Sequence, residues 1–453
     1  MPTPPSARRR LGSLIVDPAP LRLDHDFRLL WAGQAVSTAG RMMTAIVLPY
    51  QVYVLTGEVL AVGALSLVQL LPILVFTLGG GAVADAVDRR RLLLVTQVGM
   101  TAVTVGLALV ALVPAPPVAA IFALAFVAGG LGAVDQPARA SAIPRLVPPE
   151  RLQSAISLNQ IVFNAGAVVG PALGGIVLAV LSIAAAYFID AATYVAAIIA
   201  LLLIRPIPPA PGAVRPSLGA VMDGLRFARR KRPVLGTFVV DLVAMVFGSP
   251  RSLFPAMALD VFKVGPAGMG LMSSSIALGA MVAALFTGWT TGLRYPGRAV
   301  LIAVAVWGVG IAGFGLSTFS FPLALLFLAI AAGADVISAV IRSFIVQSLT
   351  PDALRGRVSS IRILVVTGGP RIGDAEAAAV AAVASPAVSV VSGGILTVLG
   401  VGLVALAMPE FARLDMRAAE AEAAAEGELA ALAELTAEAE LTAEAEAAAQ
   451  LSP

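Results

Sequence analysis

The sequence contains no cysteine and only one histidine, His25. The missing thiols exclude disulfides and metal sites built on cysteine thiolates. Histidine is the side chain that most often binds metals and titrates near neutral pH, so a single His25 in a polar segment predicts neither a metal site nor a pH sensor. We therefore expect no metal ion and no cofactor.

Signals of enzymes are missing as well. The sequence has no glycine-rich loop followed by lysine and serine or threonine, which argues against a built-in ATPase. It also has no cluster of a nucleophile with a base, or of metal ligands, that would indicate an intramembrane enzyme. We expect a protein that is not an enzyme.

Charged residues are scarce, at 13% of 453 residues, whereas 59% are hydrophobic and the mean hydropathy is +0.94. This composition is typical of a protein with many membrane spans, so the lipid bilayer is an expected partner and nucleic acid is not. The first 26 residues contain Arg8, Arg9 and Arg10 but no long apolar run. They predict a cytoplasmic tail rather than a signal peptide.

Long apolar runs are abundant instead. A helix needs roughly 20 apolar residues to cross a hydrocarbon core of ~30 Å. This rule predicts twelve transmembrane helices, at residues 29–53, 59–82, 92–113, 118–138, 155–180, 182–204, 234–257, 268–292, 299–318, 321–343, 362–384 and 386–408. If both termini are cytoplasmic, most arginines fall in cytoplasmic segments, as the positive-inside rule requires.

The predicted spans form two groups of six. The predicted parts are a cytoplasmic tail, a six-helix bundle, a cytoplasmic linker, a second six-helix bundle and an acidic Ala/Glu-rich tail, at residues 1–28, 29–204, 205–233, 234–408 and 409–453. In the linker, Leu218, Val221, Met222 and Leu225 share one helical face, which predicts an interfacial helix with its arginines toward lipid headgroups. The acidic tail has no apolar stripe, so we expect no site in it.

The two groups also echo each other in sequence. PPERL follows Arg139 in the first group, and TPDAL follows Arg342 in the second. Asp135 and Asp335 precede PPERL and TPDAL at nearly the same offset. Parallel repeats of six spans with a substrate cavity between them are a transporter architecture.

The loop GGAVADAVDRRR, between the second and third spans, resembles the signature loop of the major facilitator superfamily. Gly81, Asp85, Arg89 and Arg90 match its pattern of glycine, three residues, aspartate and then basic residues. The resemblance implies a latch in which Asp85 pairs with arginines and stabilises one conformation. The alternative is an ordinary basic loop that obeys the positive-inside rule.

The fifth span carries an unusual density of glycine. Gly166, Gly170, Pro171, Gly174 and Gly175 form the spacing GxxxGPxxGG. Small residues every fourth position let two helices approach closely. The pattern resembles the antiporter motif of exporters in this superfamily, which implies export; the alternative is generic helix packing.

Several stretches resemble the branch of the superfamily that contains the enterobactin exporter and related drug-efflux proteins. They are DHDFRLLWAGQAVSTAG, PARASAIPRLV, PRSLFPAMALD, TPDALRGRVSS and IGDAEAAA. The resemblance implies an all-α fold of twelve transmembrane helices in two six-helix bundles. It also implies export of a siderophore or of another amphiphilic metabolite or drug.

Charges inside the predicted spans are the remaining signal, because each costs ~2.5–3.5 kcal/mol on insertion scales. The candidates for proton coupling or for cavity charges are Asp241, Asp374, Arg251, Arg371 and Asp335, with further charges at Arg41, Asp190 and Glu376. Asp374 and Arg251 match charged positions of the enterobactin exporter branch. Arg371 and Asp374, three residues apart, share a helix face and are expected to pair. The alternative for each charge is a structural ion pair or a position near a helix end.

Together these observations predict a secondary exporter of the bacterial inner membrane that works by alternating access. A carboxylate in a cavity of low dielectric can bind and release protons, so we expect proton antiport, with the proton gradient as the energy source. The expected cargo is a small siderophore-like amphiphile, and the alternative is a macrolide- or tetracycline-type drug. We expect a monomer. A membrane scaffold or sensor that has lost transport is the other class, which a water-accessible cavity with intact acids would oppose.

Overall fold

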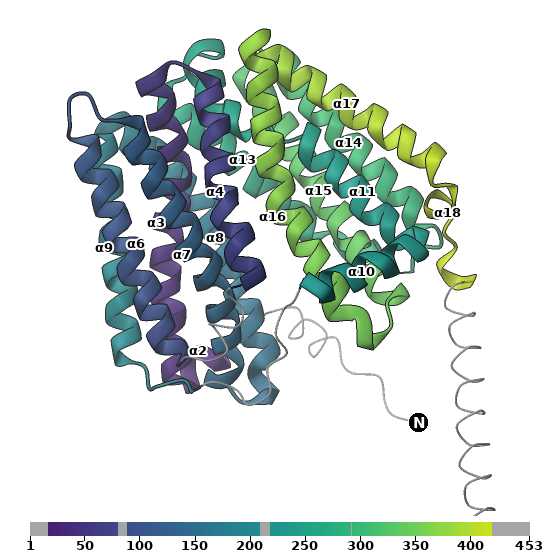
Figure 1. Cartoon of the computed structure of the whole chain (residues 1–453), viewed down its shortest axis with the longest axis horizontal. Coiled ribbons are helices and arrows are strands. Elements are labelled where there is room, and N and C mark those ends of the chain that lie inside the picture. The colour runs from purple at the N-terminus through teal and green to yellow at the C-terminus, as the bar shows by residue number, and fades with distance from the viewer. Residues whose placement is uncertain (1–16, 80–87, 209–217, 291, 419–453) are drawn as a thin grey trace, which may run out of the picture.

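The computed structural model describes residues 17–79, 88–208, 218–290 and 292–418. All regular secondary structure in these residues is helical. Two groups of long helices stand side by side (Figure 1). The first group, with the short helix that precedes it, comprises α2 (Ala19–Leu23), α3 (His25–Thr56), α4 (Val59–Gly79), α6 (Arg89–Ala111), α7 (Val118–Leu146), α8 (Pro149–Val180) and α9 (Ile183–Leu203).

The second group begins after the linker. Its long helices are α11 (Arg232–Phe247), α13 (Gly265–Leu285), α14 (Pro296–Leu316), α15 (Phe321–Leu349), α16 (Asp352–Val383) and α17 (Pro386–Ala407). The shorter elements are α10 (Leu218–Arg230), η1 (Arg251–Leu253), α12 (Phe254–Ala256), the π-helix η2 (Met257–Val261), η3 (Thr287–Thr290) and α18 (Pro409–Ala412).

In the described part of the chain, nine helical segments are long and apolar enough to cross a membrane. The predicted first and eleventh spans coincide with α3 and α16, which carry polar side chains such as Gln34, Arg41 and Arg371 along their length. The second coincides with α4, which is apolar over the shorter stretch Val59–Val75. The protein is thus a multi-pass helical membrane protein, and the count of twelve spans stays a prediction.

Several helices are longer than the apolar runs that predicted them. The fourth span was expected to end at residue 138, but α7 continues to Leu146. The fifth was expected to begin at residue 155, but α8 begins at Pro149. Hydropathy marks only the part of a helix that suits the hydrocarbon core, so it misses turns that continue beyond it. As a result Arg139, expected after the fourth span, lies inside α7.

The predicted seventh span is not one continuous α-helix. α11 ends at Phe247, and the chain continues through Gly248, Ser249 and Pro250 into a 3-10 turn, a short α-helical segment and a π-helix. Proline lacks a backbone N–H group and cannot continue the hydrogen-bond ladder. The indole N–H of Trp307 on α14 donates to the Gly248 carbonyl oxygen at 3.2 Å, which satisfies one backbone group released by the break.

A repeat relates the last three long helices of each group. The first residues of α7 and α15, of α8 and α16, and of α9 and α17 are each 203 positions apart. α7 and α15 each have 29 residues, and α8 and α16 each have 32. Residues 203 positions apart therefore occupy equivalent places in the two groups, as Arg139 and Arg342 do.

The linker helix α10 crosses one end of the second group, and α2 lies at the same end of the first group (Figure 1). We call this the α10 end and the other the far end. We expected α10 to lie at the lipid interface, but its inner face packs against protein: Ala228 is fully buried in a cluster with Phe238 of α11 and Ile361 of α16. Its Arg229 and Arg230 are exposed.

Candidate functional site

The two groups meet along two antiparallel pairs of helices. The first pair, which we call the polar seam, joins α4 to α16. Ser66 on α4 donates to the Asp374 carboxylate at 3.0 Å, and Arg371 on α16 donates to the Gln69 side-chain oxygen at 2.5 Å. A methyl group added at Gly63 would meet Ala378, so the helices also approach closely there.

Asp374 is bonded on both sides of the polar seam. Besides Ser66 of the first group, the backbone N–H of Ser252 in η1 donates to its other carboxylate oxygen at 3.0 Å, and the Ser252 hydroxyl donates to its carbonyl oxygen at 2.8 Å. The broken seventh segment thus supplies partners that a continuous helix would keep for itself. We expected Arg371 to pair with Asp374. The two groups lie within electrostatic reach of each other, and among the described residues each also makes a hydrogen bond to a side chain of α4.

The second pair of helices, the glycine seam, joins α8 to α13. A methyl group added at Gly175 would come within 2.9 Å of the Pro266 carbonyl oxygen, and one added at Gly270 within 2.6 Å of the Pro171 carbonyl oxygen. The Ser274 hydroxyl donates to the Val168 carbonyl oxygen at 2.8 Å. Backbones touch here because Gly175 and Gly270 carry no side chain.

Both seams lie toward the far end. The contacts of α4 fall between Gly63 and Gln69, near its first residue Val59, and those of α13 fall near its first residue Gly265. Tyr53, near the end of α3, also donates a hydrogen bond to Asp260 of η2 across the two groups. Toward the α10 end the two groups diverge (Figure 1). The structure is therefore closed at the far end.

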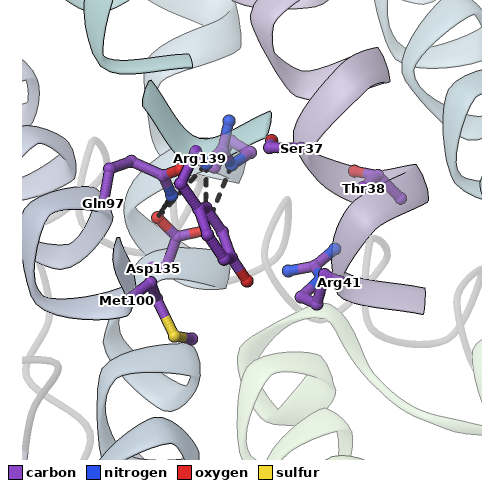
Figure 2. Close-up of a pocket in the computed structure, with 8 residues that line it drawn as sticks. Ser37, Thr38, Arg41, Gln97, Met100, Asp135 and Arg139 are labelled. Carbon is purple, nitrogen blue, oxygen red and sulfur yellow. Dashed lines mark hydrogen bonds and ion pairs between the residues drawn. The ribbon is translucent and has the colours of Figure 1, made fainter. Parts of the chain in front are cut away.

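The first group holds a buried polar cluster around Asp135 on α7. Its carboxylate accepts hydrogen bonds from Thr96 and Gln97 on α6, both at 2.8 Å, and forms an ion pair with Arg139 one turn along α7 at 3.1 Å. Figure 2 shows Gln97 and Arg139 directed at Asp135. These three residues line a pocket between α3, α6, α7 and α9, together with Ser37, Thr38, Arg41, Met100 and Tyr194.

The second group places its cluster around the equivalent arginine. Arg342 on α15 donates to Asp241 on α11 at 2.5 Å and lies 3.5 Å from Asp335, two turns back on its own helix. Asp335 is partly exposed, whereas Asp241 and Arg342 are buried. Arg251 in η1 lies within electrostatic reach of Asp335 and Asp374. The structure therefore brings Asp241 and Asp335 together, with Arg251 nearby.

Asp190 on α9 is fully buried, and its partners are hydroxyl groups. Thr44 on α3 donates to it at 2.5 Å, and Thr193 on its own helix at 3.2 Å. No ion pair involves it among the described residues. Gly40 of α3 packs directly on this carboxylate, since an added methyl group would collide with it. Asp190 thus joins α3 to α9.

Half of the predicted latch lies outside the described residues, namely Gly81 and Asp85. Arg89 is buried and donates to the Ser141 hydroxyl on α7 at 2.9 Å. Arg90 donates to the carbonyl oxygens of Leu201 and Leu202 at 2.8 and 2.7 Å, where it complements the C-terminus of α9. These contacts of both arginines remain within the first group.

The glycines of the predicted antiporter motif pack against two different helices, α3 and α13. Gly166, Gly170 and Gly174 face α3: an added methyl group at Gly170 would come within 2.6 Å of the Ala39 carbonyl oxygen. Gly175 faces α13 of the other group. The same run of α8 therefore allows close packing inside the first group and across the glycine seam.

Sequence reasoning missed the polar partners of these charges. Arg139 was not among the candidates, although an acid and an arginine four residues apart, as in Asp135 and Arg139, are the spacing of a helical ion pair. Ser66 and Gln69 carry no such signal, because nothing local to α4 shows that it packs against α16.

The comparisons with known proteins agree with this geometry. A family model described as a transmembrane secretion effector matches residues 16–434. The chain belongs to the transmembrane secretion effector family. It is similar to the enterobactin exporter EntS of Citrobacter koseri, with 27% identity over 381 residues, 84% of this chain and 91% of the relative. The EntS of Shigella boydii is 26% identical over 399 residues, 88% of this chain and 95% of the relative.

Solved structures share the fold. The nucleoside transporter NupG superposes with a TM-score of 0.67 at 14% identity, over 85% of this chain and 98% of that one. A bacterial homologue of the lysosomal transporter Spinster gives 0.62 at 15% identity, over 85% and 95%. The predicted all-α fold of the major facilitator type is confirmed. This transmembrane secretion effector is an export transporter and not an enzyme.

Proposed function

We propose that the chain exports a siderophore-like amphiphile from the bacterial cytoplasm by alternating access, coupled to inward movement of protons. The names of its relatives, which are enterobactin exporters, support the class of cargo. We assign the α10 end to the cytoplasm, because α10 and the turn after it carry a run of basic residues, Arg229 to Arg232, as the positive-inside rule requires.

The observation that carries the proposed coupling is the position of Asp374 on the polar seam. As a carboxylate it accepts hydrogen bonds from Ser66 of one group and from the Ser252 backbone of the other. Protonation removes the carboxylate charge, which weakens the hydrogen bonds that Asp374 accepts, and it makes one oxygen a donor, so that the bond with Ser66 has to reverse its direction. Proton binding at Asp374 would therefore change how tightly the far end is closed, which is what coupling requires.

Asp241 is the second candidate for coupling. It is buried, and Arg342 holds it in an ion pair that stays within the second group. Protonation of Asp241 would neutralise it and end the ion pair with Arg342, which disfavours proton binding at Asp241. We therefore rank Asp374 before Asp241.

The test uses purified protein in vesicles with enterobactin as the cargo. The wild type should export enterobactin uphill when a pH step is imposed. Asp374→Asn should still bind and exchange enterobactin without a gradient but should lose the response to the pH step, and Asp241→Asn should retain more of it. A wild type that ignores the pH step would replace proton antiport by sodium coupling or facilitated diffusion. Transport of tetracycline but not enterobactin would favour the drug-efflux alternative.

A further inference from the structure

The face of α8 that forms the glycine seam continues toward the α10 end as a row of polar side chains. Its contacts with α13 are made at Val168, Pro171 and Gly175. Steps of seven, four, three and four residues back from Pro171 stay on one face of the helix. They reach four polar, uncharged residues, which we call the α8 stripe: Asn164, Gln160, Ser157 and Gln153.

The α8 stripe points into the molecule rather than toward lipid. Gly174 packs against α3, and Pro171 packs against α13. Successive residues of a helix are about 100° apart, so Gln160 lies on the side of α8 between these two contacts. The exposed apolar residues Val169 and Leu173 lie on the opposite side of the helix. Lipid therefore contacts that opposite side, and the stripe faces the second group.

The α8 stripe is also accessible. Gln153 and Gln160 are exposed, and Ser157 and Asn164 are half-buried. The two groups touch at the far end and diverge toward the α10 end, where the stripe lies (Figure 1). A molecule that arrives from the α10 end can therefore reach Gln160.

The wall opposite the α8 stripe is apolar. The hydrogen bond from Ser274 to the Val168 carbonyl oxygen sets the register of α13 against α8. The two helices run antiparallel and both advance ~1.5 Å per residue, so four residues back on α8 and four forward on α13 place Asn164 across from Leu278. Leu278 is exposed, and so is Met281, one turn further toward the α10 end.

These two walls do not complement each other. The side-chain amide of Gln160 donates to the Asn164 side-chain oxygen at 2.9 Å, and among the described residues the two amides bond only to each other. Whichever way the amides are oriented, this bond leaves one amide oxygen and the remaining N–H groups without a partner. Leu278 and Met281 cannot supply one, so direct closure of the α10 end on the stripe would leave polar groups unsatisfied. A molecule that is polar on one side and apolar on the other would satisfy both walls.

We infer that Gln160 and Asn164 bind uncharged amide or hydroxyl groups of the exported molecule, whose apolar part packs against Leu278 and Met281. Amides and hydroxyls both donate and accept hydrogen bonds, which matches the amide oxygen and N–H groups that the two side chains offer. The α8 stripe carries no charge, so it forms no ion pair with an acid or an amine. The inference rests on the proposed function, since it names the chemistry of the exported molecule.

The first experiment measures binding to the purified full-length protein in lipid nanodiscs, with empty nanodiscs as the baseline. The probes are 4-butylbenzamide, its methyl ester analogue, which cannot donate a hydrogen bond, and benzamide, which lacks the butyl group. The wild type should bind 4-butylbenzamide about fivefold more tightly than the ester and about tenfold more tightly than benzamide. Gln160→Leu should bring the amide-to-ester ratio to about one, and Met281→Ser should lower only the butyl ratio.

Asn159→Leu is the matched control for Gln160→Leu, because Asn159 is a half-buried amide on the same turn of α8 that lies off the stripe. It should leave both ratios unchanged. An amide-to-ester ratio near one in the wild type, no binding of any probe, or a ratio that survives in Gln160→Leu would overturn the inference. An equal loss in Asn159→Leu would overturn it as well.

A second experiment tests which way the α8 stripe faces, since the native chain has no cysteine. Gln160→Cys should react with a membrane-impermeant maleimide, and enterobactin should slow the reaction. Val169→Cys, equally exposed but on the opposite side of α8, should stay unreactive in lipid. An unreactive Gln160→Cys would overturn the inference. Export of enterobactin with unselective probe binding would overturn the stripe alone, and selective binding without export would overturn the proposed function alone.

Discussion

The polar seam and the glycine seam are equivalent parts of a repeated structure with different chemistry. Pro171 on α8 and Asp374 on α16 are 203 positions apart, as the helices themselves are. At Pro171 the contact is a backbone carbonyl against Gly270, and at Asp374 it is a carboxylate bonded to both groups. The same close approach is thus made by removing side chains on one side and by pairing polar ones on the other.

This difference in chemistry means that only one of the two seams can respond to a proton. The glycine seam cannot change with protonation, because its contacts are backbone atoms and one serine hydroxyl. The polar seam contains the carboxylate of Asp374, whose hydrogen bonds do change with protonation. Among the described residues neither seam contains an ion pair, so opening either seam separates no salt bridge.

The two arginine clusters show a second difference between the groups. Arg139 has its carboxylate on its own helix, four residues before it, whereas the equivalent position before Arg342 is Ser338. The second group supplies Asp241 from α11 and Asp335 from two turns back instead. One arginine thus has a single close acid, and the other has two on different helices.

The largest predicted effect comes from removing these acids. Asp135→Asn leaves Arg139 buried without a carboxylate partner, which should lower the free energy of unfolding by about 3–5 kcal/mol. Asp241→Asn should cost less, because Asp335 remains near Arg342. Thermal denaturation of the purified variants in one detergent measures both. Equal melting temperatures for the two variants would show that the arrangement of acids does not matter.

A smaller effect is expected at the glycine seam. Gly175→Val places a branched side chain against the Pro266 carbonyl oxygen and the Gly270 backbone. Overpacking of about 1–3 kcal/mol should reduce the closed far-end conformation roughly 5- to 150-fold and slow export accordingly. Accessibility of a cysteine placed at the far end reports the conformation, since the native chain has no cysteine. Wild-type accessibility and flux would mean that this face does not form the seam.

The polar seam should respond more mildly to loss of one bond. Ser66→Ala and Gln69→Leu each remove one hydrogen bond across the seam, worth about 1 kcal/mol. Closure of the far end should weaken roughly fivefold in each variant, and the same cysteine reporter measures it. Thr56→Ala, which removes a hydroxyl bonded within α3, is the matched control. A control that opens the far end as much as Ser66→Ala would contradict the seam.

The smallest effect lies outside the membrane, where the second group ties down the chain after α18. Arg294 donates to Asp415 at 2.8 Å, and this hydrogen bond and the arginine charge hold the pKa of Asp415 below its ordinary value. Because the pKa of Asp415 is lower in the folded state than in the unfolded state, the contact stabilises the fold at pH values above the unfolded pKa. This stabilisation is lost as the pH falls through the pKa of Asp415 in the folded state. Arg294→Gln should therefore lower the melting temperature slightly at neutral pH, and this difference should shrink below about pH 4 and vanish once the pH is below the folded pKa of Asp415. An unchanged difference at low pH would contradict this assignment.

The fold was predictable because hydropathy and arginine placement are properties of single segments. Length and composition of the runs identified the helices, and the repeated Asp, Arg and PPERL or TPDAL pattern indicated two related groups. The break in the seventh segment was missed, although Gly248 and Pro250 stand at it, because a membrane helix with packed neighbours can tolerate both residues.

The candidate site was predictable only in part. Asp374 and Arg371 stood out as charges in a predicted span, but their partners Ser66 and Gln69 are ordinary polar residues whose role depends on how α4 is placed against α16. Arg41 was noticed as a charge inside the first span, yet its lack of a partner is visible only once the neighbouring carboxylates are seen to be occupied.

The unpartnered charge of Arg41 also bears on the electrical work of transport. If the cargo that passes Arg41 is an anion, each cycle carries negative charge outward, while the arginine stays in the protein. A membrane potential that is negative inside then favours export by about 2.3 kcal/mol per charge for every 100 mV. A neutral cargo would gain nothing from the voltage. The charge of this cargo would thus decide whether the membrane potential, as well as the pH difference, drives the exporter.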